Sequence, residues 1–449
     1  MENLSSYGLI IIFSLTIILS YFFNLISSRS GVPSVLMLIL LGMVVNFGLN
    51  IMNYDKPNLG PILEILGVVG LILIVLEAAL DLELVKNKIG LIVKSFAAGL
   101  LGLAATAYLG AVVLQALFNL DFETSLLFTI PLSVLSSAII IPSLEGLSEY
   151  KKEFMIYEST FSDILGIVAF YSVLSLAESD SNSGVYGEVA GNLLLTVFFA
   201  VIISYVLIYI FQNLRGHAKL FLLISVLLLL YAVGKIFHLS PLIIILMFGV
   251  ILNNYSSFFR GGLSKLIKRE QMDHVLGDFK VITAESAFVV RTFFFIIFGW
   301  SVSLISVFNL KVILIGFALL VIIYLCRAVV LFSVSGKKII PQLYLAPRGL
   351  ISVLLFYKIP PHFKSGLEFE PYLLFIIIAT CLVMSWSLIR QKNKSSELEL
   401  VDSDLDGIKN DSDASDNLLN EDITEEDNEE VNEEVNEEKI VVDENDKEF

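Results

Sequence analysis

Two acidic residues stand close together in one long apolar stretch of the chain. Glu158 and Asp163 both fall within residues 157–163, together with the hydroxyls of Ser159 and Ser162. A charged group in membrane hydrocarbon is costly, so a helix keeps one there only where it has a partner or a task. Glu158 and Asp163 are five positions apart, about 140° around a helix, and therefore face different neighbours. This spacing suits one carboxylate held by a structural partner and one free to exchange a cation for a proton.

The composition indicates that these residues lie in a membrane. Of the 449 residues, 56% are hydrophobic and 16% are charged, and the mean hydropathy is +0.82. No soluble domain of this size needs so much apolar surface, so we expect an all-α polytopic membrane protein surrounded by lipid. Cys326 and Cys381 stand in apolar runs, which argues against a disulfide framework or a cysteine metal site. We expect no cofactor and no nucleic-acid partner.

Apolar runs bounded by turn and charge signals predict about thirteen transmembrane helices within a domain that spans residues 1–393. The expected helices are 6–27, 32–50, 61–82, 90–118, 124–147, 153–178, 186–212, 218–235, 240–254, 281–306, 309–334, 339–357 and 371–390. Most of them exceed the roughly 20 residues that a membrane crossing needs.

The charges divide the chain into a membrane body and a tail. Residues 395–449 hold 23 of the 45 acidic residues and only three basic ones, so we expect 394–449 to be an acidic, disordered tail. Between the expected helices, eighteen Lys and Arg residues fall on one side of the membrane and five on the other. Cytoplasmic loops collect Lys and Arg, which places the N-terminus outside and the tail in the cytoplasm of a multi-pass cell-membrane protein.

Prolines interrupt two of the expected helices. Pro131 and Pro142 lie in the helix at 124–147, and Pro347 lies in the helix at 339–357. Each proline removes a backbone hydrogen bond. The two helices are seven apart in order, so they cross the membrane in opposite directions. Interrupted helices at matching positions of two inverted repeats indicate a transporter's midplane site, because their opened turns can coordinate a cation.

Depth in the membrane separates the two carboxylates. Glu158 lies roughly 8 Å and Asp163 roughly 15 Å from the cytoplasmic end of their helix. Arg327 lies at ~11 Å and matches Glu158 in depth better than Asp163. A buried arginine needs a carboxylate close by, and Arg291 remains the alternative partner of Glu158. If Arg327 neutralises Glu158, Asp163 is uncompensated, and a proton and a monovalent cation can compete for its oxygens.

Two further charged residues fall inside expected helices. Glu77 lies toward the cytoplasmic end of the helix at 61–82. Two interpretations of it stay open, namely that it reaches the interface beside Asp81 and Glu83 or that it belongs to the ion site. Arg348 follows Pro347 in the second interrupted helix and is a further intramembrane charge.

Five segments together resemble the monovalent cation:proton antiporter superfamily, in particular the NhaP-like sodium/proton exchangers, over residues 1 to about 393. The family patterns are Phe-Glu-Gly-Gly-Leu, Glu-Ser-x-x-Asn-Asp, a Phe-Phe-rich helix, Ala-Arg-Ala-Val and Leu-Arg-Gly-Ala-x-Ser. The similar segments, in the same order, are Leu76-Glu77-Ala78-Ala79-Leu80, Glu158-Ser159-Thr160-Phe161-Ser162-Asp163, Arg291-Thr292-Phe293-Phe294-Phe295, Cys326-Arg327-Ala328-Val329 and Pro347-Arg348-Gly349-Leu350-Ile351-Ser352. Five matches in family order are specific, whereas no single one is.

The resemblance implies the antiporter fold, a homodimer and an elevator-like movement of a core that bears both interrupted helices. It also implies that Asp163 binds the cation or the proton, and that Glu158 and Arg327 form a structural ion pair. The residues expected to complete the cation site are Ser159, Ser162, Glu77 and the backbone of the first break, including Ser137 and Ala138.

Two departures from the family pattern bear on the ion. The family's Thr-Asp-Pro aligns near Ala138-Ile139-Ile140, where this chain has neither a carboxylate nor a proline. Ser136-Ser137 followed by aliphatic residues instead resembles the branch that includes potassium/proton antiporters. Ser162 stands where electroneutral members have Asn and electrogenic members a second Asp, so one-for-one exchange is expected. The leading hypothesis is a secondary antiporter, not an enzyme, that exchanges Na⁺, or K⁺ or Li⁺, for H⁺. A cation channel gated through the tail and a non-transporting sensor are the alternatives.

Overall fold

The computed structural model describes most of the chain up to residue 391. The described residues are 6–51, 60–144, 147–178, 185–212, 219–236, 240–260, 267–301, 304–336, 339–364 and 368–391. Residues Met1–Ile389 form one unit and Arg390–Phe449 a second, and the predicted acidic tail at 394–449 lies outside the described residues. No residue in the described ranges belongs to a β-strand, so the all-α class is confirmed.

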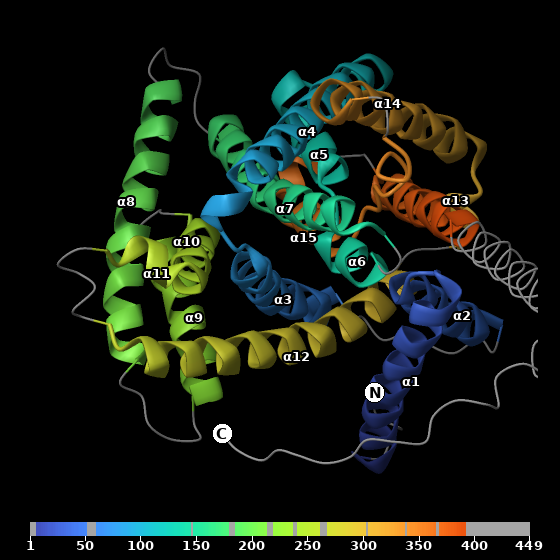
Figure 1. Cartoon of the computed structure of the whole chain (residues 1–449). Helices are drawn as coiled ribbons and strands as arrows, with labels where there is room; N and C mark the ends of the chain where they lie inside the picture. Colours follow the sequence, from blue (N-terminus) through green and yellow to red (C-terminus); the bar gives the residue numbers. More distant parts are fainter. Residues whose placement is uncertain are drawn as a thin grey trace, which may run out of the picture. The chain divides into compact units, whose positions relative to one another are not determined.

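Helices account for nearly all of the described chain (Figure 1). In chain order they are α1 (Ser6–Ser30), α2 (Ser34–Ile51), α3 (Gly60–Asp81), η1 (Lys86–Lys88), α4 (Ile89–Phe118), α5 (Phe122–Ser133), α6 (Ser137–Ile140), η2 (Ile141–Ser143), α7 (Glu149–Glu178), α8 (Val185–Phe211), α9 (Lys219–Ile236), α10 (Pro241–Asn253), α11 (Tyr255–Phe258), α12 (Arg269–Ser301), α13 (Leu304–Val307), α14 (Leu310–Ser335), α15 (Leu350–Tyr357), η4 (Pro361–Lys364) and a last helix, Glu370–Gln391. Eight helical segments of the described ranges are long and apolar enough to cross a membrane, and the total of thirteen stays a prediction.

The contacts between helices define two groups. Helices α4, α5, α6, α7, α14 and α15 pack mainly on one another and form what we call the α7 group. The last helix joins this group, because Tyr372 packs against Phe118 of α4 and the hydroxyl of Thr380 accepts a hydrogen bond from the amide of Arg348 at 3.1 Å. Helices α2, α3, α8, α9, α10 and α12 form the α12 group, and α1 packs on α2 and α12 (Figure 1). The groups meet where α3, α8 and α10 touch α7 and where α3 touches α15.

The first interrupted helix breaks just after α5. Residues 134–136 are extended between α5 and α6, with φ/ψ of −71/130° at Val134 and −92/103° at Ser136. The break expected from the sequence, at residues 136–140, therefore lies slightly earlier in the structure, because Ser137–Ile140 is helical and the extended residues are 134–136. Pro131 stands inside α5 without an amide hydrogen to donate, which weakens the turn that ends there.

The second interrupted helix differs more from its prediction. Only Leu350–Tyr357 of the expected helix at 339–357 is helical, and residues 340–349 form turns and irregular backbone. Pro341 and Pro347 explain the difference, because neither donates a backbone hydrogen bond and each restricts the residue before it to non-helical conformations. The two breaks touch directly, since the amide of Ser136 donates to the carbonyl of Pro347 at 3.0 Å.

Candidate functional site

Helix α7 carries both carboxylates of the opening motif in the interior of the α7 group. Glu158 and Asp163 are each only 1% exposed. Irregular backbone in hydrocarbon is tolerated only where its polar groups find partners within the protein. Side chains of α7 and of the helices packed on it must therefore provide hydrogen-bond partners for the backbone of the two breaks as well as for one another.

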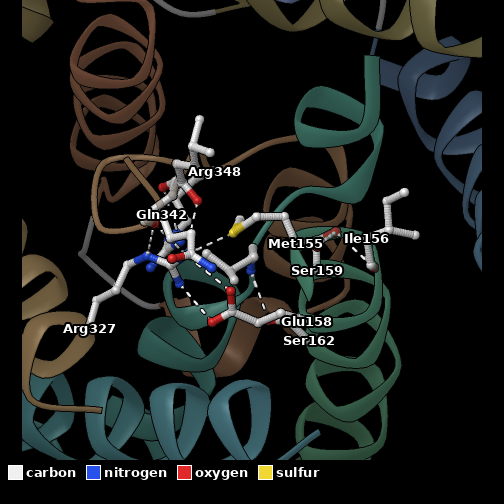
Figure 2. A network of polar contacts seen from close by, with 11 residues as sticks. Met155, Ile156, Glu158, Ser159, Ser162, Arg327, Gln342 and Arg348 are labelled. Atoms are coloured by element: carbon white, nitrogen blue, oxygen red, sulfur yellow. Dashed lines mark hydrogen bonds and ion pairs between the residues drawn. The ribbon is translucent and has the colours of Figure 1, made fainter. Parts of the chain in front are cut away.

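Glu158 is paired with Arg327 of α14. Nη1 of Arg327 donates to Oε1 of Glu158 at 3.0 Å, and Nη2 donates to Oε2 at 3.1 Å (Figure 2). This two-pronged geometry is the strong form of an arginine–carboxylate contact. Arg291, the alternative partner considered from the sequence, lies instead on α12 and bonds another carboxylate.

Two arginines satisfy the backbone carbonyls of the breaks. Nε of Arg327 donates to the carbonyl of Gln342 at 3.0 Å, and Nη2 donates to the same oxygen at 2.7 Å and to the carbonyl of Leu345 at 3.2 Å. Arg348 donates through Nε to the carbonyl of Leu132 at 2.5 Å and through Nη1 to that of Ala346 at 3.2 Å. Arg348 thus joins the end of α5 to the second break. Both arginines, with Glu158, line a cavity of about 20 Å³.

Asp163 is held by a hydroxyl and an amide rather than by a cation. Both the Oγ and the backbone N of Ser137 donate to its Oδ2, the amide at 3.3 Å. Its Oδ1 is buried and accepts no hydrogen bond from the described residues. Ion pairs join Glu158 and Glu77 to arginines, but none joins Asp163 to a described residue.

Glu77 lies across from this site in the α12 group. Its Oε1 accepts a hydrogen bond from Nη2 of Arg291 at 3.1 Å, and the two side chains are 20% and 19% exposed. Arg291 also lines a cavity of about 140 Å³ between α1, α2, α6 and α12, which Ala138 borders as well.

The structure brings only some of the expected site residues to Asp163. Ser137 contacts it directly. Ser162 accepts a hydrogen bond from the amide of Leu135 at 2.9 Å and so supports the first break. The hydroxyl of Ser159 donates to the carbonyls of Met155 and Ile156 of its own helix (Figure 2).

Some contributors were missed by reasoning from the sequence. The carbonyls of Gln342 and Leu345 and the amide of Ser136 have no sequence signal, because any residue carries these groups. Tyr157 also went unassigned, although its hydroxyl donates to the carbonyl of Glu83 at 2.8 Å and ties α7 to the end of α3.

Two interrupted helices that meet beside a buried ion pair, in an all-helical multi-pass membrane protein, define the antiporter fold. A family model described as "Sodium/hydrogen exchanger, transmembrane" matches residues 12–390. The chain belongs to this family, whose members are transporters and not enzymes.

The solved structures agree with this fold. The sodium proton antiporter MjNhaP1 from Methanocaldococcus jannaschii, at pH 8, is similar with a TM-score of 0.63 and 20% identity, over 87% of this chain and 97% of that chain. An electron-microscopy structure of the same antiporter gives 0.59 and 20%, over 88% and 98%. No curated protein sequence matches the chain.

Proposed function

We propose that this chain exchanges Na⁺ for H⁺ and that Asp163 binds either ion in turn. One observation carries the proposal. Of three carboxylates near the breaks, Glu158 and Glu77 each have an arginine partner, whereas no described cation pairs with Asp163. A buried charge without a partner is costly, so Asp163 favours uptake of a proton or a monovalent cation before the site moves.

The exchange is one cation for one proton. Asp163 is the uncompensated carboxylate of the site, and Ser162 supplies a neutral hydroxyl where a second acid would add a charge. With either ion bound, the site at Asp163 carries no net charge and can move across the membrane, whereas a site with the bare carboxylate cannot. Glu158 and Arg327 act as a structural brace, because their charges cancel and Arg327 also binds two carbonyls of the second break.

Alternating access follows from relative movement of the two helix groups. Both breaks belong to the α7 group, so the ion site moves with that group past the α12 group. The α12 group makes the contacts between the two protomers of the homodimer. A cavity of about 640 Å³ supports this division, since α7 lines it on one side and α8, α9 and α10 line the other. From the distribution of Lys and Arg among the loops, we infer that this cavity opens to the outside and that the acidic tail lies in the cytoplasm.

Ser137 and the backbone near Ala138 supply neutral oxygen to the ion, with Ser159 and Glu77 completing the shell. K⁺ is the second candidate ion, because Ala138-Ile139-Ile140 lacks the carboxylate of the Thr-Asp-Pro pattern. A site with fewer charged oxygens offsets less of the cost of dehydrating a strongly hydrated ion such as Li⁺ or Na⁺. Such a site therefore favours K⁺, which is larger and more weakly hydrated.

The test is ion exchange by the full chain in proteoliposomes that contain a pH dye. A pulse of Na⁺ is expected to change the internal pH, and pulses of K⁺ and Li⁺ rank the ions. The rate should not respond to an imposed membrane voltage if the exchange is electroneutral. Cation conduction without obligatory proton movement would indicate a channel instead, and no flux of either kind would indicate a sensor.

A further inference from the structure

Thr160 carries a buried hydroxyl that the account so far leaves without a role. Its exposed fraction is 0%, and its Oγ1 has no hydrogen-bond partner among the described residues. Threonine and serine hydroxyls inside helices usually donate to the carbonyl four residues earlier. Ser159 and Ser172 on the same helix do so, at 2.8 Å each. Thr160 makes no such bond, although a buried hydroxyl without a partner lowers the stability of the fold.

The position of Thr160 on α7 relates it to the ion site. Tyr157, Thr160 and Asp163 are three residues apart and therefore neighbours along one face of the helix. Tyr157 reaches the end of α3 through Glu83, and Asp163 contacts α6 through Ser137. Thr160 lies between them in the sequence of α7, a helix that also contacts α3, which bears Glu77.

Asp163 and Thr160 each carry one buried oxygen that has no hydrogen-bond partner among the described residues. Both hydrogen bonds from Ser137 go to Oδ2 of Asp163, while Oδ1 is buried and unpartnered, like Oγ1 of Thr160. A hydroxyl has two lone pairs with which to accept. Alkali cations are hard ions that bind carboxylate, carbonyl and hydroxyl oxygens.

We propose that Oγ1 of Thr160 is a direct ligand of the transported monovalent cation, together with Oδ1 of Asp163. The inference rests on the proposed function and deepens it. In the family pattern Glu-Ser-x-x-Asn-Asp, this position is an unspecified one, so the ligand is a feature of this chain. It supplies a neutral oxygen on the side of Asp163 away from Ser162 and Glu158.

The test compares Thr160→Val, which replaces the hydroxyl by a methyl group, with Thr160→Ser, which keeps it. In proteoliposomes, Thr160→Val should raise the half-saturating cation concentration about three- to tenfold, the range that the loss of one net polar contact produces. Its maximal rate should stay near that of the wild type, and Thr160→Ser should bind the cation nearly as the wild type does. The melting temperature of Thr160→Val without cation should equal or exceed that of the wild type, because no unpartnered hydroxyl remains.

The outcomes separate this inference from the proposed function. An unchanged half-saturating concentration in Thr160→Val, with exchange intact, overturns the inference, and so does an equal loss in both variants. If the wild type exchanges no ions, the proposed function fails. The increase in melting temperature on adding Na⁺ or K⁺ in detergent then decides the inference alone, since ligand binding stabilises the folded state. A shift in the wild type that Thr160→Val reduces supports it, and equal or absent shifts overturn it.

Discussion

The buried charges of this chain differ by what neutralises them. Glu158 has a two-pronged arginine partner, Glu77 has a single arginine contact, and Asp163 is bonded by Ser137 alone among the described residues. The two-pronged pairing with Arg327 makes Glu158 structural, because that carboxylate requires no ion from solution. The carboxylate without an arginine partner is the one that gains most from an ion that comes and goes.

Removal of Arg327 tests the structural half of this division. Arg327→Ala leaves Glu158 buried without its cation and frees the carbonyls of Gln342 and Leu345. We expect the free energy of unfolding to fall by about 3–5 kcal/mol, measured by denaturant unfolding in detergent. Lys152→Ala, at an exposed position, is the control and should change it by less than about 0.5 kcal/mol.

A double variant separates charge from packing at this pair. Arg327→Ala combined with Glu158→Gln leaves no unpaired charge, so it should recover part of the lost stability. If the double variant is no more stable than Arg327→Ala alone, the burial of an unpaired Glu158 is not the cause of the loss.

At the scale of elements, the two breaks depend on their direct contact. Gly349 stands immediately before α15, at a point where an added Cβ would lie 2.2 Å from Oγ and 2.7 Å from Cβ of Ser136. The amide of Ser136 meanwhile donates to the carbonyl of Pro347. The close approach and the hydrogen bond together couple the breaks, so a change in one displaces the other.

Gly349→Ala should therefore destabilise the protein and slow exchange. Overpacking of this kind costs about 1–3 kcal/mol, measured by denaturant unfolding in detergent. Gly102→Ala is the matched control, because no atom lies within 4 Å of an added Cβ there and the helix gains roughly 0.5–1 kcal/mol from alanine. Ser136→Gly in the Gly349→Ala background should restore part of the loss, and a failure to do so would place the strain elsewhere.

The helices and the breaks also show which parts of the structure could be predicted from the sequence. Apolar length and the charged motif predicted α7 and placed Glu158 at the depth of Arg327, because helical rise converts residue number into depth. The irregular stretch at 340–349 was not predicted, since its conformation depends on Arg327 and Arg348 as donors to its carbonyls. The contact between Ser137 and Asp163 was implied only by the family resemblance. Backbone groups are the same in every residue, so their partners follow from tertiary contacts.

At the scale of the whole molecule, we propose that the N-terminus lies outside the membrane and the tail in the cytoplasm. Single-cysteine labelling from each side tests it, and the native Cys326 and Cys381 are buried and so give little background. Lys86→Cys should react with a membrane-impermeant thiol reagent only from the cytoplasmic side, and Phe308→Cys only from outside. Both positions are exposed. Labelling of Lys86→Cys from outside would reverse the proposed orientation.

The central claim is that the unpaired carboxylate of Asp163 carries out the exchange. The most direct measurement compares the wild type, Asp163→Asn and Asp121→Asn in proteoliposomes with an internal pH dye and pulses of Na⁺, K⁺ or Li⁺. Asp121 precedes α5, where asparagine serves equally well as a helix cap, so its variant should exchange like the wild type. Asp163→Asn should fold normally yet lose cation-driven pH change with every cation. A cation-driven pH change that survives in Asp163→Asn would contradict the account.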